Sequence, residues 1–200
     1  MQDLTPWHMR RGSLASFVFL GCLLGGWPLS AASFSLTARE TQEAIRFGQR
    51  SVVNEDFGRE WKTTNTSGET LTVVTPFFRL AQAARNAAFK PGTLKQREID
   101  SLQREHRDRL VFWAHLRGGR EDFARWYRPV LLVQSKGEIK PSFVQNERTA
   151  IRQGEGRFVS RSIYAFPAND LDGKSRVALV VRDHDDQEVA RFTVDLSAMR

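Results

Sequence analysis

Residues 189–196 have the sequence VARFTVDL, in which apolar and polar side chains alternate. In an extended strand, successive side chains point to opposite faces, so this pattern separates the two kinds of residue. The apolar residues that share one face are Ala190, Phe192, Val194 and Leu196. The residues on the opposite face are Arg191, Thr193 and Asp195. A period of two predicts a β-strand with one buried face, and we expect Phe192 to be buried there.

Similar short segments, rich in aromatic and β-branched residues, recur through the preceding 80 or so residues between turn residues. The expected strands are 110–116, 130–133, 139–144, 157–166, 177–181 and 189–196. Segment 110–116 is apolar on both predicted faces, which is typical of a strand covered on both sides. Short antiparallel strands at this spacing predict a β-sandwich. Their rhythm resembles that of immunoglobulin-like or C2-like sandwiches, although the Cys–Trp–Cys framework of antibody domains is absent.

The N-terminal half has helical patterns instead. Thr37 and Glu40 form a capping box before a helix expected over 38–49. Pro76 opens a second helix, which Pro91 and Gly92 end, and Thr93 with Gln96 precedes a third over 94–108. A hairpin is expected between them, pairing 59–64 with 70–75. The sequence therefore predicts an α+β fold, with a mainly helical part over 33–108 and a β-sandwich part over 109–200, forming one folding unit.

The first 32 residues have the order of a signal peptide. Arg10 and Arg11 precede an apolar stretch over 14–24, and Ser30 and Ala32 occupy the small-residue positions of a cleavage site. We expect cleavage before Ser33 and a periplasmic or secreted protein. An uncleaved membrane anchor is the main alternative. Lipidation at Cys22 is a weaker one, because Leu20 stands where a small residue is expected.

Composition narrows the chemistry of the mature chain. Cys22 is the only cysteine, so a cleaved chain has no disulfide and no thiol nucleophile. The net charge is +7, and it falls to +6 when Arg10, Arg11 and Asp3 are removed with the signal peptide. No sequence motif indicates a cofactor, and none is expected.

Two acidic segments are candidate metal sites, and both are better explained as turns. Segment 169–173 (NDLDG) looks like part of a calcium loop, but Ala168 and Leu179 stand at its first and last ligand positions. Residues 183–186 (DHDD) combine an imidazole with three carboxylates, which divalent metals accept. They lie where a hairpin turn is expected, so we expect no metal.

Catalytic motifs are also missing. The chain has no Gly-x-Ser-x-Gly and no His-Glu-x-x-His segment, and its kinase-like tripeptides at 56–58 and 106–108 occur in the wrong order. The histidines left after cleavage are His106, His115 and His184. No catalytic residue is expected, and the alternative is an exported hydrolase whose site is assembled from residues distant in sequence.

The remaining features favour binding. Phe123, Trp126 and Tyr127 lie in a segment, 120–128, that could form a short helix. We expect them to pack against the sheets, with an exposed aromatic ledge as the alternative.

Basic residues of the two middle helices alternate with acidic ones, which is typical of a solvated face rather than a specific nucleic-acid site. Those basic residues are Arg79, Arg85, Lys90, Lys95, Arg97, Arg104, Arg107 and Arg109. The leading hypothesis is a non-catalytic envelope or secreted module that binds another protein or supports an assembly. A binder of anionic surface polymers is a further alternative.

Overall fold

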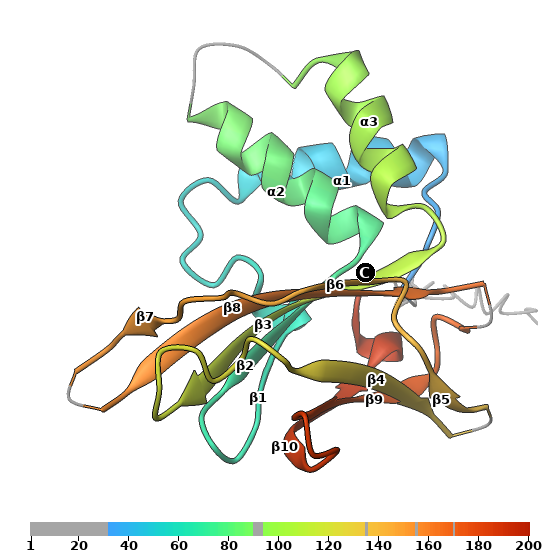
Figure 1. The fold of residues 1–200 in the computed structure, drawn as a ribbon. Helices are drawn as coiled ribbons and strands as arrows, with labels where there is room; N and C mark the ends of the chain where they lie inside the picture. The colour runs from blue at the N-terminus through green and yellow to red at the C-terminus, as the bar shows by residue number, and fades with distance from the viewer. Residues whose placement is uncertain (1–31, 90–93, 135, 155, 170) are drawn as a thin grey trace, which may run out of the picture.

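The computed structural model describes residues 32–200 except 90–93, 135, 155 and 170. The expected signal peptide, apart from Ala32, lies outside these residues. Within them the chain forms three α-helices and ten strands in two antiparallel sheets, an α+β fold. Figure 1 shows the helices on one face of the larger sheet, sheet A, and the smaller sheet, sheet B, on the other side.

The helices are α1 (Ala38–Arg50), α2 (Pro76–Ala88) and α3 (Gln96–His106). The capping box of α1 is confirmed: the Thr37 hydroxyl accepts the Glu40 amide at 3.3 Å, and the Glu40 carboxylate accepts the Thr37 amide at 2.7 Å. Pro76 opens α2 as expected. Helix α3 begins two residues later than expected, with Glu98 accepting the Lys95 amide at 2.9 Å; Thr93 lies outside the described residues.

Helices α1 and α2 cross at very short range because of a glycine. A Cβ atom on Gly48 would lie 2.0 Å from the backbone oxygen of Ala81, so no larger residue fits without moving one helix. Ala44, Ala81 and Ala84 are buried at the same contact. Small residues on both helices thus set the short distance between α1 and α2.

Sheet A has the strand order β1-β2-β3-β8-β6, and β7 pairs with the outer side of β8. The strands are β1 (Lys62–Thr64), β2 (Thr70–Val74), β3 (Arg109–Gly118), β6 (Phe143–Gln145), β7 (Ile151–Arg152) and β8 (Phe158–Pro167). The expected hairpin is confirmed as β1–β2. Its second strand pairs with β3, and β3 pairs with β8 over its whole length, from Arg109 opposite Pro167 to Gly118 opposite Phe158.

Sheet B has the order β10-β9-β4-β5, formed by β4 (Arg128–Val133), β5 (Gly137–Ile139), β9 (Arg176–Arg182) and β10 (Glu188–Asp195). The alternation of its last strand is confirmed. Phe192 is 2 % exposed and lies opposite Leu179, whereas Thr193 is exposed. Leu196 is buried too, although it begins a short 3-10 helix (Leu196–Ala198) instead of ending the strand.

The prediction of one strand over 139–144 was wrong. The segment divides at Lys140–Ser142: Ile139 ends β5 in sheet B, and Phe143 begins β6 in sheet A. Pro141 has no amide hydrogen to donate to a ladder and so marks the break. The chain changes sheet here, and the Ser142 amide already bonds the Ala165 oxygen at 2.7 Å.

Strand β3 is buried on both faces, as its sequence predicted. Phe112, Ala114 and Leu116 belong to the side that faces sheet B, and Val111 and Trp113 to the side that faces the helices, where Trp113 meets Phe78 of α2 edge-on at 6.2 Å. Residues of both sheets and of the helices form a single hydrophobic cluster. Sheet A is therefore the middle layer of the molecule.

Near the first strand, aromatic residues join the helices to sheet A. Trp61, which ends a short 3-10 helix (Arg59–Trp61), is fully buried among Phe47, Phe77 and Phe78. Arg200 lies against this cluster: its guanidinium is 4.4 Å from the centre of the Phe47 ring and 2.7 Å from Glu60. Its backbone oxygen accepts hydrogen bonds from Trp61 and from Thr75. Arg200, which follows the last strand, thereby connects sheet B to the helical layer.

Candidate functional site

The structure brings together two segments that the sequence analysis treated separately. The aromatic segment after β3 and the acidic turn between β9 and β10 line one pocket of about 460 Å³, which we call the Trp126 pocket. It is lined by Arg120, Asp122, Phe123, Trp126, Tyr127, Asp183 and His184.

The aromatic wall is built by consecutive turns, not by the short helix considered from the sequence. Amides of Phe123, Arg125 and Tyr127 each bond the oxygen three residues earlier. Gly118, at the end of β3, makes room for Phe123, since a Cβ there would lie 2.2 Å from its ring. Phe123 and Tyr127 are half-buried, and their rings meet edge-on with centres 5.7 Å apart. These two side chains are therefore packed, as the sequence predicted.

Trp126 differs from its two neighbours. Its exposed fraction is 65 %, and the Arg125 guanidinium lies 4.9 Å from the centre of its ring. Burial of an indole ring stabilises a protein, and an exposed tryptophan does not provide that stabilisation. Its exposure at the edge of a pocket therefore favours a role in binding. For this residue the structure supports the alternative of an exposed aromatic ledge.

The acidic wall is a tightly held turn. The Asp183 amide bonds the Gln187 oxygen at 2.9 Å, and the Asp183 carboxylate accepts the amides of Asp185 and Gln187. From β4, Arg128 donates to the backbone oxygens of Asp183 and His184 at 3.1 and 3.2 Å. This is the turn that the sequence predicted, and it holds the wall in a fixed position.

The same turn is the one cluster of metal-ligating side chains found among the described residues. Ligand atoms of Asp183, His184 and Asp185 lie within 4.8 Å of one another, and His184 Nε2 is 3.1 Å from Asp185 Oδ2. His184 and Asp185 are 71 and 68 % exposed, and the Asp183 carboxylate is already engaged by two amides. The hydrogen bonds of a turn account for this geometry without an ion.

The second acidic segment, 169–173, lies partly outside the described residues. Asp172 accepts the Lys174 amide at 3.1 Å, which is a turn contact. Gly173 lies against Ala32, whose oxygen would be 2.1 Å from a Cβ at that position. Both contacts are those of a packed turn.

Asn146 is a residue of this region that sequence reasoning missed. Its amide nitrogen donates to the Tyr127 backbone oxygen at 2.8 Å, and its amide oxygen accepts the hydroxyl of Tyr164 at 3.0 Å. Tyr164 is fully buried, and burial raises the pKa of its hydroxyl. Asn146 thus links the aromatic wall to sheet A, a role that no local pattern marks.

His115 is the histidine best placed to belong to a hydrolase site. Its Nδ1 lies 3.4 Å from the Thr70 hydroxyl on the neighbouring strand, and burial followed by the charges of Arg161 and Lys62 lowers its pKa. A hydroxyl next to a neutral imidazole is one part of nucleophilic catalysis. The part that would orient the imidazole is missing: no described side chain makes a hydrogen bond to Nε2.

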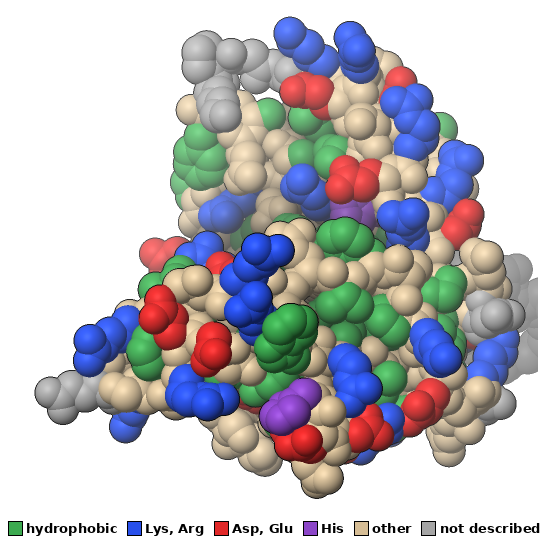
Figure 2. All heavy atoms as spheres, viewed as in Figure 1, with side chains coloured by type: hydrophobic (Ala, Val, Ile, Leu, Met, Phe, Trp, Pro, Cys, Tyr) green, Lys and Arg blue, Asp and Glu red, His purple; other side chains and the backbone are tan. Residues whose placement is uncertain are grey.

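The distribution of charge is uneven in a way the sequence did not predict. Figure 2 shows Lys and Arg side chains interleaved with Asp and Glu over the visible face, in agreement with the alternation expected for the helices. One group of arginines is different: Arg117 of β3, Arg161 of β8 and Arg157, just before β8, share one side of sheet A with His115. Only the strand register brings them together.

Comparisons with known proteins add little to this geometry. No protein-family model matches the chain, and no curated protein is similar to it. A crystal structure from Burkholderia pseudomallei K96243, described as a novel protein of unknown function, covers 82 % of this chain and 92 % of its own, at 10 % identity and a TM-score of 0.42. In the described part of the chain, no helix is both long and apolar enough to span a membrane.

Proposed function

We propose that this chain is an exported, non-catalytic module that binds another envelope or secreted protein through the Trp126 pocket. The observation that carries the proposal is the exposed Trp126 ring beside a preformed hollow. Tryptophan, tyrosine and arginine dominate the residues that contribute most to protein–protein affinity, and this pocket contains all three.

The rigidity of the pocket supports the same function. Phe123, Asn146 and Arg128 hold the backbone of its two walls, so little of the backbone has to be ordered when a partner binds. Less conformational entropy is then lost on association, and more of the contact energy appears as affinity. The pocket needs no metal and no cofactor for this role.

A catalytic role has less support. Catalysis by a histidine and carboxylates gains most from exclusion of water, and His184 and Asp185 are both largely exposed. The hydrolase alternative rests on the Thr70–His115 contact alone.

We also propose a finer description of the scaffold, an antiparallel β-sandwich with immunoglobulin-like or C2-like strand rhythm, which the shared hydrophobic cluster of the two sheets supports.

Site-specific photo-crosslinking tests the proposed function. A photoreactive phenylalanine analogue replaces Trp126 in one variant and Phe89 in a control, because Phe89 is equally exposed, at 63 %, but lies at the end of α2 away from the pocket. Expression in the native envelope followed by irradiation should give a discrete protein adduct at position 126 and none at 89. Equal adducts at both positions, or none at 126, would contradict the proposal.

A further inference from the structure

The helices cover only part of the face of sheet A that they contact. Val74, Val111 and Ala165 are buried on this face, and Trp113 lies under Phe78. Further along β3 the same face reaches solvent, since His115 is half-buried and Arg117 is exposed. In Figure 1 the β7 end of the sheet projects beyond the helices. We call this uncovered part the open face of sheet A.

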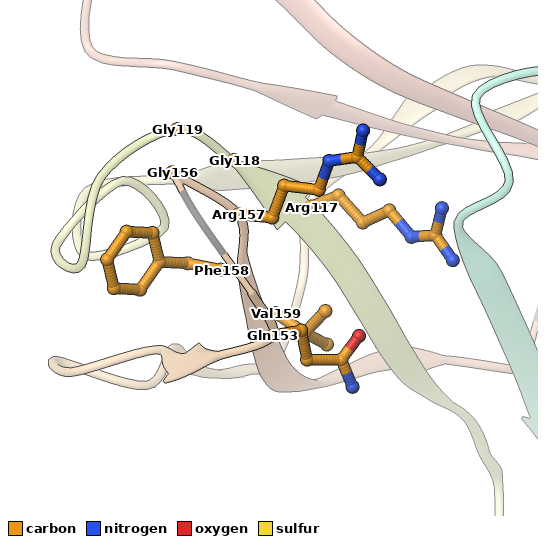
Figure 3. A pocket seen from close by; sticks show the side chains of 8 residues that line it. All are labelled: Arg117, Gly118, Gly119, Gln153, Gly156, Arg157, Phe158 and Val159. Carbon is orange, nitrogen blue, oxygen red and sulfur yellow. The ribbon is translucent and has the colours of Figure 1, made fainter.

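The strand register gathers positive charge on the open face. His115 lies opposite Arg161, and Arg117 lies opposite Val159. Arg157 and Arg161 are two residues before and after Val159, so alternation places them on its side of the strand. Figure 3 shows the side chains of Arg117 and Arg157 extending in the same direction, with Phe158 pointing the opposite way. Arg117, Arg157 and Val159 line a pocket of about 460 Å³ at this end of the sheet, and the Arg117 guanidinium lies against Gly68 in the turn between β1 and β2.

In the described part of the chain, these arginines have no acidic partner. Among the described residues, no carboxylate lies within 4 Å of the guanidinium groups of Arg117, Arg157 or Arg161. The two acids nearby accept backbone amides instead: Glu69 accepts that of Arg117 at 3.0 Å, and Glu147 accepts that of Arg161 at 2.7 Å. The guanidinium groups of these three arginines are therefore not engaged by a described carboxylate and can receive one from a partner.

The arginines on the strands of sheet B differ from this set. All four arginines of its strands, Arg128, Arg176, Arg182 and Arg191, have a carboxylate within 4 Å. Within the described ranges, unpaired arginines also occur on the helices, for example Arg39, Arg97 and Arg104, so the set on sheet A is distinguished by its position on one face and not by the lack of an ion pair.

The open face is also partly apolar. Ile151 of β7 lies opposite Val159 and is 46 % exposed, and Ile163 of β8 is half-buried on the same face. A phosphate polymer or a nucleic-acid backbone would leave these side chains in water. A peptide with both carboxylates and apolar side chains would use the arginines and the isoleucines together.

We propose that the open face of sheet A binds an acidic, partly apolar segment of a partner protein. Arg117, Arg157 and Arg161 receive its carboxylates, and Ile151, Val159 and Ile163 contact its apolar side chains. The proposal concerns a different surface from the Trp126 pocket, and it shares with the proposed function only that the partner is a protein.

Fluorescence anisotropy with the folded chain tests this. The probe is a short labelled peptide in which Glu and Val alternate, compared with one in which Gln replaces every Glu. Wild type should bind the Glu peptide, more weakly as salt is raised, and the Arg117→Gln/Arg157→Gln variant should bind it roughly tenfold or more weakly. The matched control is Arg176→Gln/Arg191→Gln, which removes the same charge from sheet B and should bind like wild type.

Several outcomes would overturn the proposal. Equal binding of the Glu and Gln peptides, or an unchanged affinity in the Arg117/Arg157 variant, would exclude recognition of carboxylates by this face. Binding of polyphosphate or phosphatidylglycerol vesicles without binding of the peptide would assign the face to another class of anion. The Trp126→Ala variant should still bind the peptide. A wrong proposal for the open face can therefore be distinguished from a wrong proposal for the Trp126 pocket. Circular dichroism melts confirm that each variant is folded.

Discussion

Sheet A and sheet B are both antiparallel, yet they differ in how their faces are covered and in whether their arginines are paired with acids. The strands at the centre of sheet A are covered on two sides, by the helices and by sheet B, until the helices end and an unpaired basic face begins. Sheet B has one covered side, and on its strands the arginines are paired with acids. The comparison shows that burial sets the apolar pattern of each strand, whereas the pairing of arginines with acids differs between the exposed parts of the two sheets.

The strongest test of this contrast compares neighbouring residues. In β10, Phe192→Ala should lower the free energy of unfolding by about 3–5 kcal/mol and Thr193→Ala by less than about 0.5 kcal/mol, because only Phe192 is buried. In β3, Phe112→Ala should cost a similar 3–5 kcal/mol, and its neighbour Val111→Ala about 1.6 kcal/mol, from two methyl groups at ~0.8 each. Urea melts measure all four. A costlier Thr193→Ala than Phe192→Ala would mean that the register of β10 is wrong.

A second test concerns pH and the contact between the helices and sheet A. His106, at the end of α3, is 5 % exposed, and neither ring nitrogen has a hydrogen-bond partner. Burial lowers its pKa from the usual 6.5; among nearby charges, Glu105 raises the pKa and Arg79 and Arg109 lower it. The unfolded chain therefore binds the proton more readily, so stability should fall as the pH drops below about 6.5.

His106→Leu should flatten this dependence, because it removes the titrating group without breaking a hydrogen bond. The measurement is the urea midpoint of wild type and variant at pH 7.5 and at pH 5. His115, whose pKa is also lowered, contributes in the same direction and remains in both proteins. If the variant loses as much stability as wild type between pH 7.5 and pH 5, the pH dependence comes from groups other than His106.

A third test compares the two sets of arginines, with a smaller effect. Arg191 lies 2.5 Å from Glu188, so Arg191→Gln should lower stability by up to about 1 kcal/mol, within the usual range for an exposed pair. Arg117→Gln breaks no ion pair and should leave stability unchanged or slightly higher. Thermal melts at low and high salt measure both. A larger loss from Arg117→Gln would show that its charge serves the fold.

The smallest expected effect is that of a chelator. The turn at 183–187 is held by its own amides and by Arg128, so EDTA should not shift the thermal midpoint of the purified chain. A clear decrease would instead assign a structural metal to Asp183, His184 and Asp185.

The sequence predicted those features that depend on neighbouring residues. The Thr37–Glu40 capping box, the Pro76 helix start and the alternation of 189–196 each involve a few adjacent positions, and all three are confirmed. The change of sheet at Pro141 was missed, because a strand pattern does not say which sheet a strand will join. The expected export signal stays a prediction, as its residues up to 31 lie outside the described structure.

The candidate surfaces could not be predicted in the same way. Trp126 and His184 are far apart in the chain and meet only because β4 and β9 are neighbours. Arg117 and Arg157 meet only through the register of β3 and β8. Aromatic and basic residues were both noted from the sequence, but their exposure and their partners are properties of the folded chain.

The long pairing of β3 with β8 also has a kinetic consequence. The two paired ends, Gly118 and Phe158, are separated by the whole of β4 to β7, so a loop must close before the middle layer forms. Contacts between distant residues form slowly compared with helices and hairpins. During that interval β3, apolar on both sides, can pair with β2, which precedes it in the chain beyond α2 and α3, but its other edge is unpaired. An early-folding chain is therefore most exposed to aggregation along β3, until β8 arrives to cover it.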